Sequence, residues 1–549
     1  MSKEKGISRG RFLRQLLLGG GLLGGGWWAW NRFGKEAPPR EIPGEIVGAS
    51  AKTGHLLRNG ALPPPSRTEE TPLLIIGGGV AGLATAWHLQ RCHNRQDYLL
   101  LELEDRPGGN AAWGQNTISA YPWGAHYLPV PGPEHGDLLD LLRTFGIFRK
   151  LADGTEHVDP LYLCHSPKER LLIHGKWQEG LVPKIGLAAS EAKQIAEFQA
   201  AMAAWSLRKG ADERWAFAIP LDESSTDPEI LALDALTMDE WMRAQGWDAP
   251  ALHWYVNYSC RDDYGTPHTQ TSAWAGIHYF AARRETLPGV EAGAVLTWPQ
   301  GNGWLIQEWL KHLRGEIRTG ALVTRIENTE TGVTADYYDV QKQETVRVKA
   351  EKAVYAGPRF ALPYLMREVP RGSASTFSYA PWAVANVSVN RRPVGGTGTP
   401  LSWDNVSYHS DSLGYVLADH QALDSRRPGK AVLTWYQPLD GASPVEARKA
   451  ALARSYADWQ AMVLADLEQM HPGIREEVTR VDVWLWGHGM IRPVPGMLWG
   501  TERANARKPL VNVHFAHSDL SGISIFEEAF YQGKRAAGEV AGDAEGCLG

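Results

Sequence analysis

The chain has 549 residues, which is too long for one ordinary core and predicts two to four modules. Hydrophobic residues make up 43% and charged residues 21%, the balance of a soluble globular protein, and a net charge of −6 with no basic tract excludes nucleic acid as a partner. Four cysteines without a CxxC pair argue against an iron–sulfur cluster or a structural zinc site, so no metal site is predicted. Buried thiols are favoured over a disulfide.

Residues 1–30 are expected to be a targeting segment that is not part of the folded domain. Basic residues precede an apolar, glycine-rich stretch, which is the order of a signal segment. The string Ser8 to Arg14 resembles a twin-arginine export signal, with Gly10 in place of one of the adjacent arginines. We expect a periplasmic protein, or one anchored in the membrane through its N-terminus and facing the periplasm; a cytoplasmic enzyme is the alternative. The proline-rich residues 31–70 predict an extended linker.

A dinucleotide-binding turn follows this linker. The apolar run 73–76 is typical of a parallel strand buried on both faces, and a helical pattern covers 83–91. The turn between them reads G-x-G-x-x-G: the first glycine allows the tight turn, the second lets backbone approach a pyrophosphate, and the third lets helix and strand pack closely. The turn residues predicted to bind the dinucleotide are Gly77, Gly79, Ala81 and Gly82. A second apolar run ends at Glu102, where a carboxylate accepts hydrogen bonds from ribose hydroxyls.

The segment that begins at Glu102 resembles part of a flavoenzyme superfamily. Residues 102–110 are similar to E-x-x-x-R-x-G-G-R, which follows the second strand in FAD-dependent amine oxidases, protoporphyrinogen oxidases and phytoene desaturases. The resemblance implies FAD as the cofactor, with Arg106, Gly108 and Gly109 against its pyrophosphate. Asn110 stands where the family has Arg or Lys. A plain NAD-dependent dehydrogenase is disfavoured for this reason.

Later segments extend the resemblance over most of the chain. Residues 123–126 resemble the family loop beside the flavin ring, and 354–358 resemble its apolar strand that ends in proline. Near the C-terminus a buried-strand pattern leads to an acid that, in the family, binds the ribityl or phosphate groups, and then to a helix whose N-terminus points at the flavin pyrimidine. The further cofactor residues implied are Gly124, Val323, which would hold the adenine, Pro358 and Asp519.

The resemblance implies an α/β fold, in which a discontinuous Rossmann-like (NAD(P)-binding-like) domain holds FAD and carries an inserted α+β substrate domain. The FAD-binding segments are expected at 70–150, 295–360 and 475–545. The insertions 151–294 and 361–474 would form the substrate domain above the flavin.

Three residues are candidates for catalysis: Trp486, His488 and His517. Aromatic walls near a flavin suit an amine that must be held neutral and desolvated. His488 could act as a base or orient substrate, or it could be a hydrogen-bonded structural residue at a turn. Asp262 and Asp263 could meet a cationic substrate, although a solvated loop is the favoured interpretation.

The expected activity is hydride removal from a small-molecule substrate, most simply an amine or polyamine, with oxygen or a quinone as electron acceptor. Amine oxidases of the family often place a lysine near the flavin N5, and the nearest residues here are Ala385 and Asn386, which favours a quinone. A desaturase of an apolar or isoprenoid substrate and a non-catalytic FAD-bearing binding or assembly protein remain alternatives. An acid-lined cavity would favour an amine, and a long apolar tunnel would favour a desaturase.

Overall fold

The computed structural model describes residues 41–60, 62–150, 154–284, 286–369, 377–393, 395–422 and 429–542. The predicted targeting segment, residues 1–30, lies outside these residues. Contacts divide the chain into the units Met1–Pro43 and Gly44–Gly549, and every helix and strand given below belongs to the second unit. None of the described helices is long and apolar enough to cross a membrane.

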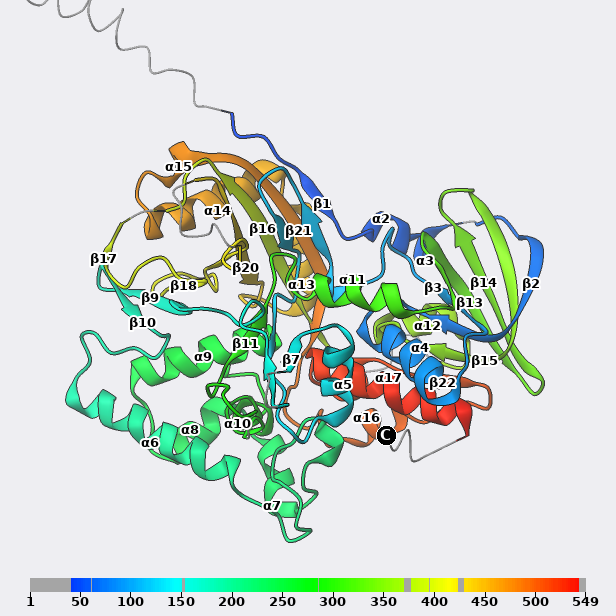
Figure 1. Ribbon diagram of the computed structural model, residues 1–549, viewed down its shortest axis with the longest axis horizontal. Coiled ribbons are helices and arrows are strands. Elements are labelled where there is room, and N and C mark those ends of the chain that lie inside the picture. The colour runs from blue at the N-terminus through cyan, green and yellow to red at the C-terminus, as the bar shows by residue number, and fades with distance from the viewer. Residues whose placement is uncertain are drawn as a thin grey trace, which may run out of the picture. The chain divides into compact units, whose positions relative to one another are not determined.

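A seven-stranded sheet carries the dinucleotide-binding turn (Figure 1). Its order is β12-β3-β2-β15-β14-β13, with β22 beside β15. Strands β12, β3, β2, β15 and β22 run parallel, and β14 and β13 extend the sheet antiparallel. Alternate residues of β2 face opposite sides of the sheet: Leu73 and Ile75 belong to one hydrophobic core, and Leu74 and Ile76 belong to another. Both faces of this strand are therefore covered. The strands are β2 (Pro65–Ile76), β3 (Tyr98–Leu101), β12 (Glu316–Arg318), β13 (Ala321–Thr329), β14 (Gly332–Asp339), β15 (Glu344–Tyr355) and β22 (Val513–Phe515).

Two helices from distant parts of the sequence pack against each other beside this sheet: α4 (Val80–His93) and α17 (Phe526–Ala541). Glycine permits their close approach, since a Cβ at Gly533 would lie 2.3 Å from the carbonyl oxygen of Ala81. Two further helices, α5 (Gly136–Thr144) and α11 (Gly303–His312), contribute to the same core. The C-terminal helix is therefore fixed against the helix that follows the glycine turn.

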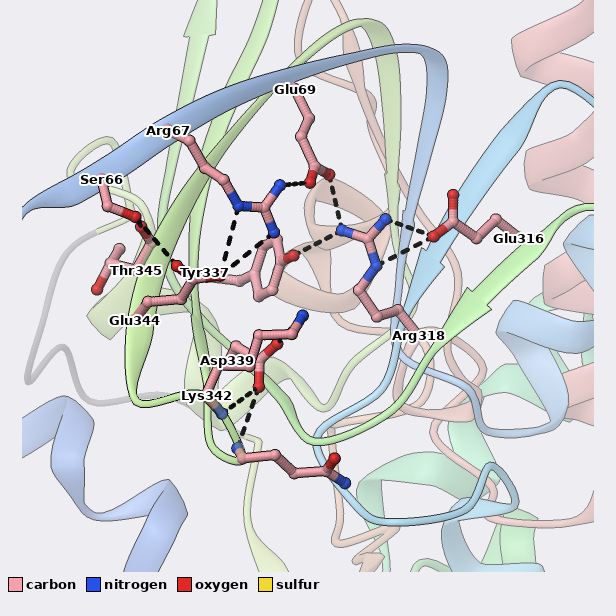
Figure 2. Close-up of polar contacts among 11 residues, drawn as sticks. Ser66, Arg67, Glu69, Glu316, Arg318, Tyr337, Asp339, Lys342, Glu344 and Thr345 are labelled. Carbon is pink, nitrogen blue, oxygen red and sulfur yellow. Dashed lines mark hydrogen bonds and ion pairs between the residues drawn. The ribbon is translucent and has the colours of Figure 1, made fainter.

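The exposed half of β2 is held at the edge of the sheet by ion pairs (Figure 2). Arg318 donates from Nη1 to Glu69 at 2.7 Å and to the Tyr337 hydroxyl at 2.6 Å. Arg67, on the same strand, contacts both Glu69 and Glu344. Residues 65–70 belong to the sheet through their backbone pairing with β15, and these side-chain contacts add to that pairing.

The described part of the predicted linker 31–70 is therefore folded. Before β2 it forms β1 (Ile46–Gly48), α2 (Ala51–Gly54) and α3 (Leu56–Asn59). β1 pairs in parallel with β21, which satisfies its backbone groups, and Ser50 donates to Glu104 through both its amide and its hydroxyl. A long-range strand pairing of this kind leaves no local signal in a proline-rich stretch.

A nine-stranded mixed sheet forms the second layer, in the order β1-β21-β16-β20-β19-β18-β9-β10-β17. All 11 residues of β16 are buried. The strand β21 was expected in the FAD-binding segment 475–545, but it pairs with β16 and so belongs to this sheet. The remaining strands are β9 (Glu169–Ile173), β10 (Lys176–Glu179), β16 (Tyr379–Val389), β17 (Thr397–Gly398), β18 (Asp404–Ser407), β19 (Tyr415–Leu417), β20 (Ala431–Pro438) and β21 (Val478–Ile491).

Helices and short hairpins complete the molecule. A cluster of helices with its own core lies next to β9 and β10 in Figure 1: α6 (Ala189–Ser206), α7 (Pro228–Leu231), α8 (Met238–Ala244), α9 (Pro250–Tyr264) and α10 (Ala273–Ala281). Other helices are α12 (Leu362–Leu365), α13 (Pro444–Ala453), α14 (Tyr456–Met470), α15 (Ile474–Glu477) and α16 (Thr501–Ala506). Two-stranded pairs join β4 (Trp113–Gln115) to β5 (Ala120–Pro122), β6 (Tyr127–Pro129) to β11 (Val295–Thr297), and β7 (Phe148–Lys150) to β8 (Glu156–Val158).

The sequence favoured buried thiols over a disulfide, and the structure differs at one cysteine. Cys164 and Cys260 are free and buried, whereas Cys92 is disulfide-bonded.

Candidate active site

The glycine turn leaves an open cradle at its second glycine. Gly77 has φ of +108°, and a Cβ at Gly82 would lie 1.9 Å from the Gly77 carbonyl oxygen, so both positions need glycine for backbone reasons. At Gly79, by contrast, an added Cβ would meet only the Cα of Gly109, at 3.9 Å. Space at this glycine, beside the N-terminus of α4, fits the approach of a pyrophosphate.

The loop that carries Gly108 and Gly109 lies directly against this turn. The Gly108 amide donates to the Gly78 carbonyl at 2.9 Å, and Gly79 and Gly108 form a parallel bridge. Arg106 extends from the same loop over Trp113, with its guanidinium carbon 4.7 Å from the ring centroid. Its nearest acid, Asp105, is 3.9 Å away and well exposed, so the guanidinium remains accessible to a phosphate.

Glu102 lies at the end of β3, beside the turn. Its carboxylate accepts from the Gly78 amide at 2.6 Å and from the Glu104 amide at 2.9 Å. Burial raises the pKa of Glu102 to about 7, and these hydrogen bonds oppose the rise. Val323 is close by, because the amide of Ala321, two residues earlier on β13, donates to the Glu102 carbonyl. The arrangement suits the adenosine end of a dinucleotide.

The carboxyl ends of β2, β15 and β22 meet at one edge of the sheet, where ligands bind in folds of this kind. A Cβ at Gly77 would lie 2.9 Å from the Ala356 backbone, so the two turns are in contact. Pro358 follows on the second turn. Asp519, after β22, accepts from the Arg359 amide at 2.8 Å. Predicted cofactor residues from three distant segments are thus brought together.

Asp519 is buried and bonded to protein groups. It accepts from the Tyr379 hydroxyl at 2.7 Å, and its other oxygen lies 3.1 Å from Nδ1 of His517. Burial opposes its ionisation, but His517 and the hydrogen bonds outweigh burial and lower the pKa of Asp519. Nδ1 of His517 also lies 3.1 Å from the Asp519 amide nitrogen, so the ring contacts both the backbone and the carboxylate of Asp519. The geometry gives His517 a positioning role.

Asn110 joins the two sheets. Its side-chain amide donates to the Gly489 carbonyl of β21 at 2.5 Å, and its own carbonyl accepts from the Ala125 amide at 2.8 Å. A Cβ at Gly124 would lie 2.3 Å from that carbonyl, so glycine is required for this contact. Asn110 therefore holds the Gly124 loop against β21.

Trp486 and His488 both lie on β21 but face different neighbours. The indole N–H of Trp486 donates to the Trp123 carbonyl at 2.6 Å, which places this ring beside the Gly124 loop. His488 stacks on Phe360 at 3.8 Å between centroids. Burial and then Arg448 lower the pKa of His488 to about 3, so it is neutral and a weak base. His488 is part of a strand, not of the turn considered in the sequence.

Sequence reasoning considered Asp262 for a cationic substrate but did not find its two partners. The three carboxylates, which we call the acid cluster, are Glu169, Asp262 and Asp404. Glu169 and Asp404 are direct partners in the parallel pair β9–β18, and Asp262 is in the last turn of α9, not in a solvated loop. Burial, and then Glu169 and Asp262, raise the pKa of Asp404 well above its ordinary value. Burial, and then Asp263 and Glu169, raise the pKa of Asp262 to about 7. In the described chain neither aspartate forms an ion pair with a lysine or arginine.

Tyrosines and aromatic rings connect the acid cluster to the Gly124 loop. Tyr258 donates to Asp404 at 3.5 Å, and Tyr127 hydrogen-bonds Asp262. His126, next to Tyr127, stacks on Tyr436 at 4.7 Å, and the Tyr436 hydroxyl donates to the Gly124 carbonyl at 3.1 Å. The acid cluster therefore lies behind the loop expected beside the flavin ring.

A cavity of about 640 Å³ opens beside the acid cluster. Glu169 and Tyr258 line one part of it. Another part is apolar and comes from the loop before α6 and from α6 itself: Leu181, Val182, Pro183, Leu187 and Ile195. Of the acid cluster, Glu169 lines the cavity, and Lys184 lines it too. A carboxylate next to aliphatic side chains has the chemistry to hold an alkyl chain with a cationic end.

A family model and a curated protein each match part of the chain. Residues 75–145 match the NAD(P)-binding Rossmann-like domain family. The chain is 25% identical over 293 residues to the oxidoreductase PigB of Serratia sp. (strain ATCC 39006), a match that covers 49% of this chain and 40% of that protein.

Solved structures show the same fold across 84–86% of this chain. A double mutant of putrescine oxidase superposes with a TM-score of 0.63 at 16% identity, covering 86% of this chain and all of the other. Cyclohexylamine oxidase from Brevibacterium oxydans IH-35A gives 0.59 at 16% identity, over 86% and 99%. A fatty acid isomerase from P. acnes gives 0.57 at 16% identity, over 84% and 97%. The chain thus has the α/β fold that amine oxidases use, and residues 75–145 within it match a nucleotide-binding domain family.

Proposed function

We propose that this protein is an FAD-dependent oxidoreductase that removes hydride from a cationic amine, with diamines or polyamines as its substrate class. The observation that carries the proposal is the acid cluster, placed between a cavity and the Gly124 loop. Glu102, the open cradle at Gly79 and the accessible Arg106 support FAD as the cofactor.

The acid cluster favours a cation because neighbouring carboxylates without a basic partner repel each other. A protonated amine bound at Glu169, the member of the cluster that lines the cavity, would relieve this repulsion and would allow the neighbouring Asp262 and Asp404 to ionise. The apolar part of the cavity would bury the methylene chain between two amino groups. A wholly apolar substrate would leave the carboxylates without a partner, which counts against the desaturase.

Bound FAD would supply the hydride acceptor, and the protein's residues would prepare the amine. A protonated amine must lose a proton before its carbon can give up hydride. Asp262, with a pKa of about 7, is matched to accept that proton near neutral pH. Tyr258, Tyr436 and Trp403 would exclude water, and the imine produced would hydrolyse to an aldehyde and ammonia.

The cellular setting is proposed with this function. A periplasmic enzyme, loaded with its cofactor before export, would explain the predicted targeting segment, and the disulfide at Cys92 suits an oxidising compartment. The acceptor would be a quinone in preference to oxygen, because Asn386 on β16 is bonded to Pro122 and Thr434 where amine oxidases often have a lysine. Fractionation of cells that express the full chain tests the location.

Steady-state kinetics with matched substrates test the substrate class. At pH 7.5 we expect kcat/KM for a linear diamine to exceed that for the corresponding alkyl monoamine, and the alcohol to be inactive. Asp404→Asn should remove most of this preference for the diamine. A tenfold preference corresponds to about 1.4 kcal/mol, which the loss of one charge contact can account for. Glu351→Gln, an exposed carboxylate on β15, is the control. Equal rates for monoamine and diamine in both proteins would contradict the proposal.

A further inference from the structure

Three ligand-type side chains meet in the helical part of the substrate domain, outside the site described above. Asp239 comes from α8, His253 from α9, and His268 from the loop between α9 and α10. Nδ1 of His253 lies 3.0 Å from Nε2 of His268, and Oδ1 of Asp239 lies 3.2 Å and 3.4 Å from these two nitrogens. All three groups are mostly buried.

The outer ring nitrogens of both histidines are held as donors. Nε2 of His253 is 3.0 Å from the Trp247 carbonyl, which can only accept. Nδ1 of His268 is 3.0 Å from Oδ1 of Asn257, and the same oxygen accepts from the His268 amide, so it too is an acceptor. In neutral imidazoles a proton on each outer nitrogen leaves the inner nitrogen with a lone pair.

The centre of the cluster therefore contains three acceptors and no donor. Two imidazole lone pairs and a carboxylate oxygen face each other, and Oδ1 of Asp239 receives no hydrogen bond in the described structure. Its other oxygen is taken by Arg243, at 2.9 Å. Acceptors this close to one another call for a cation between them.

We propose that Asp239, His253 and His268 bind a divalent transition-metal ion, with Zn²⁺ as the best match. Imidazole nitrogen and carboxylate oxygen bind zinc at about 2.0–2.2 Å, and the edges of such a tetrahedron measure about 3.3 Å, close to the three separations here. Water would complete the coordination. The hydrogen bonds to Trp247 and Asn257 have the form of the outer contacts that orient metal-binding histidines.

The ion would act as a structural tie. The loop 265–272 already docks on α8, where the amides of Met238 and Asp239 donate to the carbonyls of Thr271 and His268. The same loop contacts Arg492, just after β21, through Thr266 and Gln270. A metal would fix this loop to α8 and to α9, the helix whose last turn presents Asp262. The cysteine count gave no hint of the site because its ligands are histidines and an aspartate that are not close in sequence.

Metal analysis of the full-length protein, purified through a tag without histidines, tests the proposal. We expect about one equivalent of zinc per chain to survive dialysis, and a chelator to lower the Tm by several degrees, with recovery on adding Zn²⁺. His253→Gln and His268→Gln should each lose the metal and the response to the chelator. His409→Gln, an exposed histidine on another loop, should keep both.

The proposal would be overturned if the wild-type protein carried no transition metal and its Tm did not rise with added Zn²⁺ or Co²⁺. The remaining explanation would then be a protonated histidine pair beside Asp239. The wild-type result decides even if the variants do not fold. Flavin content and amine turnover are recorded on the same samples, so a failure of the metal site is distinguished from a failure of the proposed activity.

Discussion

Asp262, the proposed proton acceptor, illustrates how a residue placed for binding can lower stability. Its pKa in the folded protein, about 7, lies above the unfolded value of about 3.9. Between these pH values the folded protein binds more protons than the unfolded chain, so the free energy of unfolding falls as the pH rises from about 4 to about 7.

The variant Asp262→Asn should therefore stabilise the protein without substrate at pH 8, with a rise in Tm of about 1 °C for each kcal/mol recovered in a chain of 549 residues. At pH 4, where the wild-type carboxyl is protonated, the gain should vanish. Thermal unfolding at both pH values measures this, with Glu351→Gln as the unchanged control. A variant that loses stability equally at both pH values would refute the electrostatic explanation.

The same residue sets an expected pH dependence of substrate binding. From pH 6 to pH 8 the ionised fraction of a group with a pKa of 7 rises about tenfold, while an alkyl diamine stays protonated. We expect KM for the diamine to fall by about this factor in the wild type and to stay flat in Asp262→Asn. The opposite slope in the wild type would mean that substrate binds as a neutral amine.

At the level of elements, two glycines of the turn between β2 and α4 have different roles: Gly82 is needed for folding, and Gly79 is expected to be needed for binding the cofactor. An added Cβ at Gly82 would collide with the Gly77 backbone, whereas one at Gly79 meets only the Cα of Gly109. Gly82→Ala should destabilise the protein by about 1–3 kcal/mol.

Gly79→Ala should keep the Tm of the cofactor-free protein but weaken FAD binding by about tenfold or more, because the new methyl would occupy the path of the pyrophosphate. Titration of the cofactor-free protein with FAD, followed by flavin fluorescence, gives both affinities. Equal FAD affinity in Gly79→Ala and the wild type would place the pyrophosphate elsewhere.

Sequence patterns predicted the elements whose structure is local. The apolar run before Gly77, the turn and Glu102 lie in the order and spacing of one β–turn–α–β unit. The partner of a strand is not local information: β21 was expected with the FAD segments, yet it pairs with β16, and the proline-rich stretch before β2 contains β1. Glu169 and Asp404 were missed as partners of Asp262 for the same reason, since the three carboxylates come from three elements. One signal in the sequence could have indicated the cluster: each of the buried strands β9 and β18 begins with a charged residue.

For the whole molecule, the contact between the two sheets is expected to control the rate. Asn110 holds the Gly124 loop to Gly489 of β21, so Asn110→Ala should lose about 1 kcal/mol of stability and lower the rate of amine oxidation while FAD remains bound. Gln90→Ala removes the bond that Gln90 donates to the His312 carbonyl and the bond that it accepts from the Arg314 amide, and it should leave the rate unchanged. An equal loss of rate in both variants would assign the effect to stability alone.

The most direct test of the account is an absorbance spectrum of the purified protein before and after anaerobic mixing with a diamine. We predict the bands of oxidised flavin, their bleaching by the diamine, and a return of colour that is faster with a quinone than with air. A yellow protein that no amine bleaches would contradict the proposed substrate class. A colourless protein that does not take up FAD would contradict the assignment of the site itself.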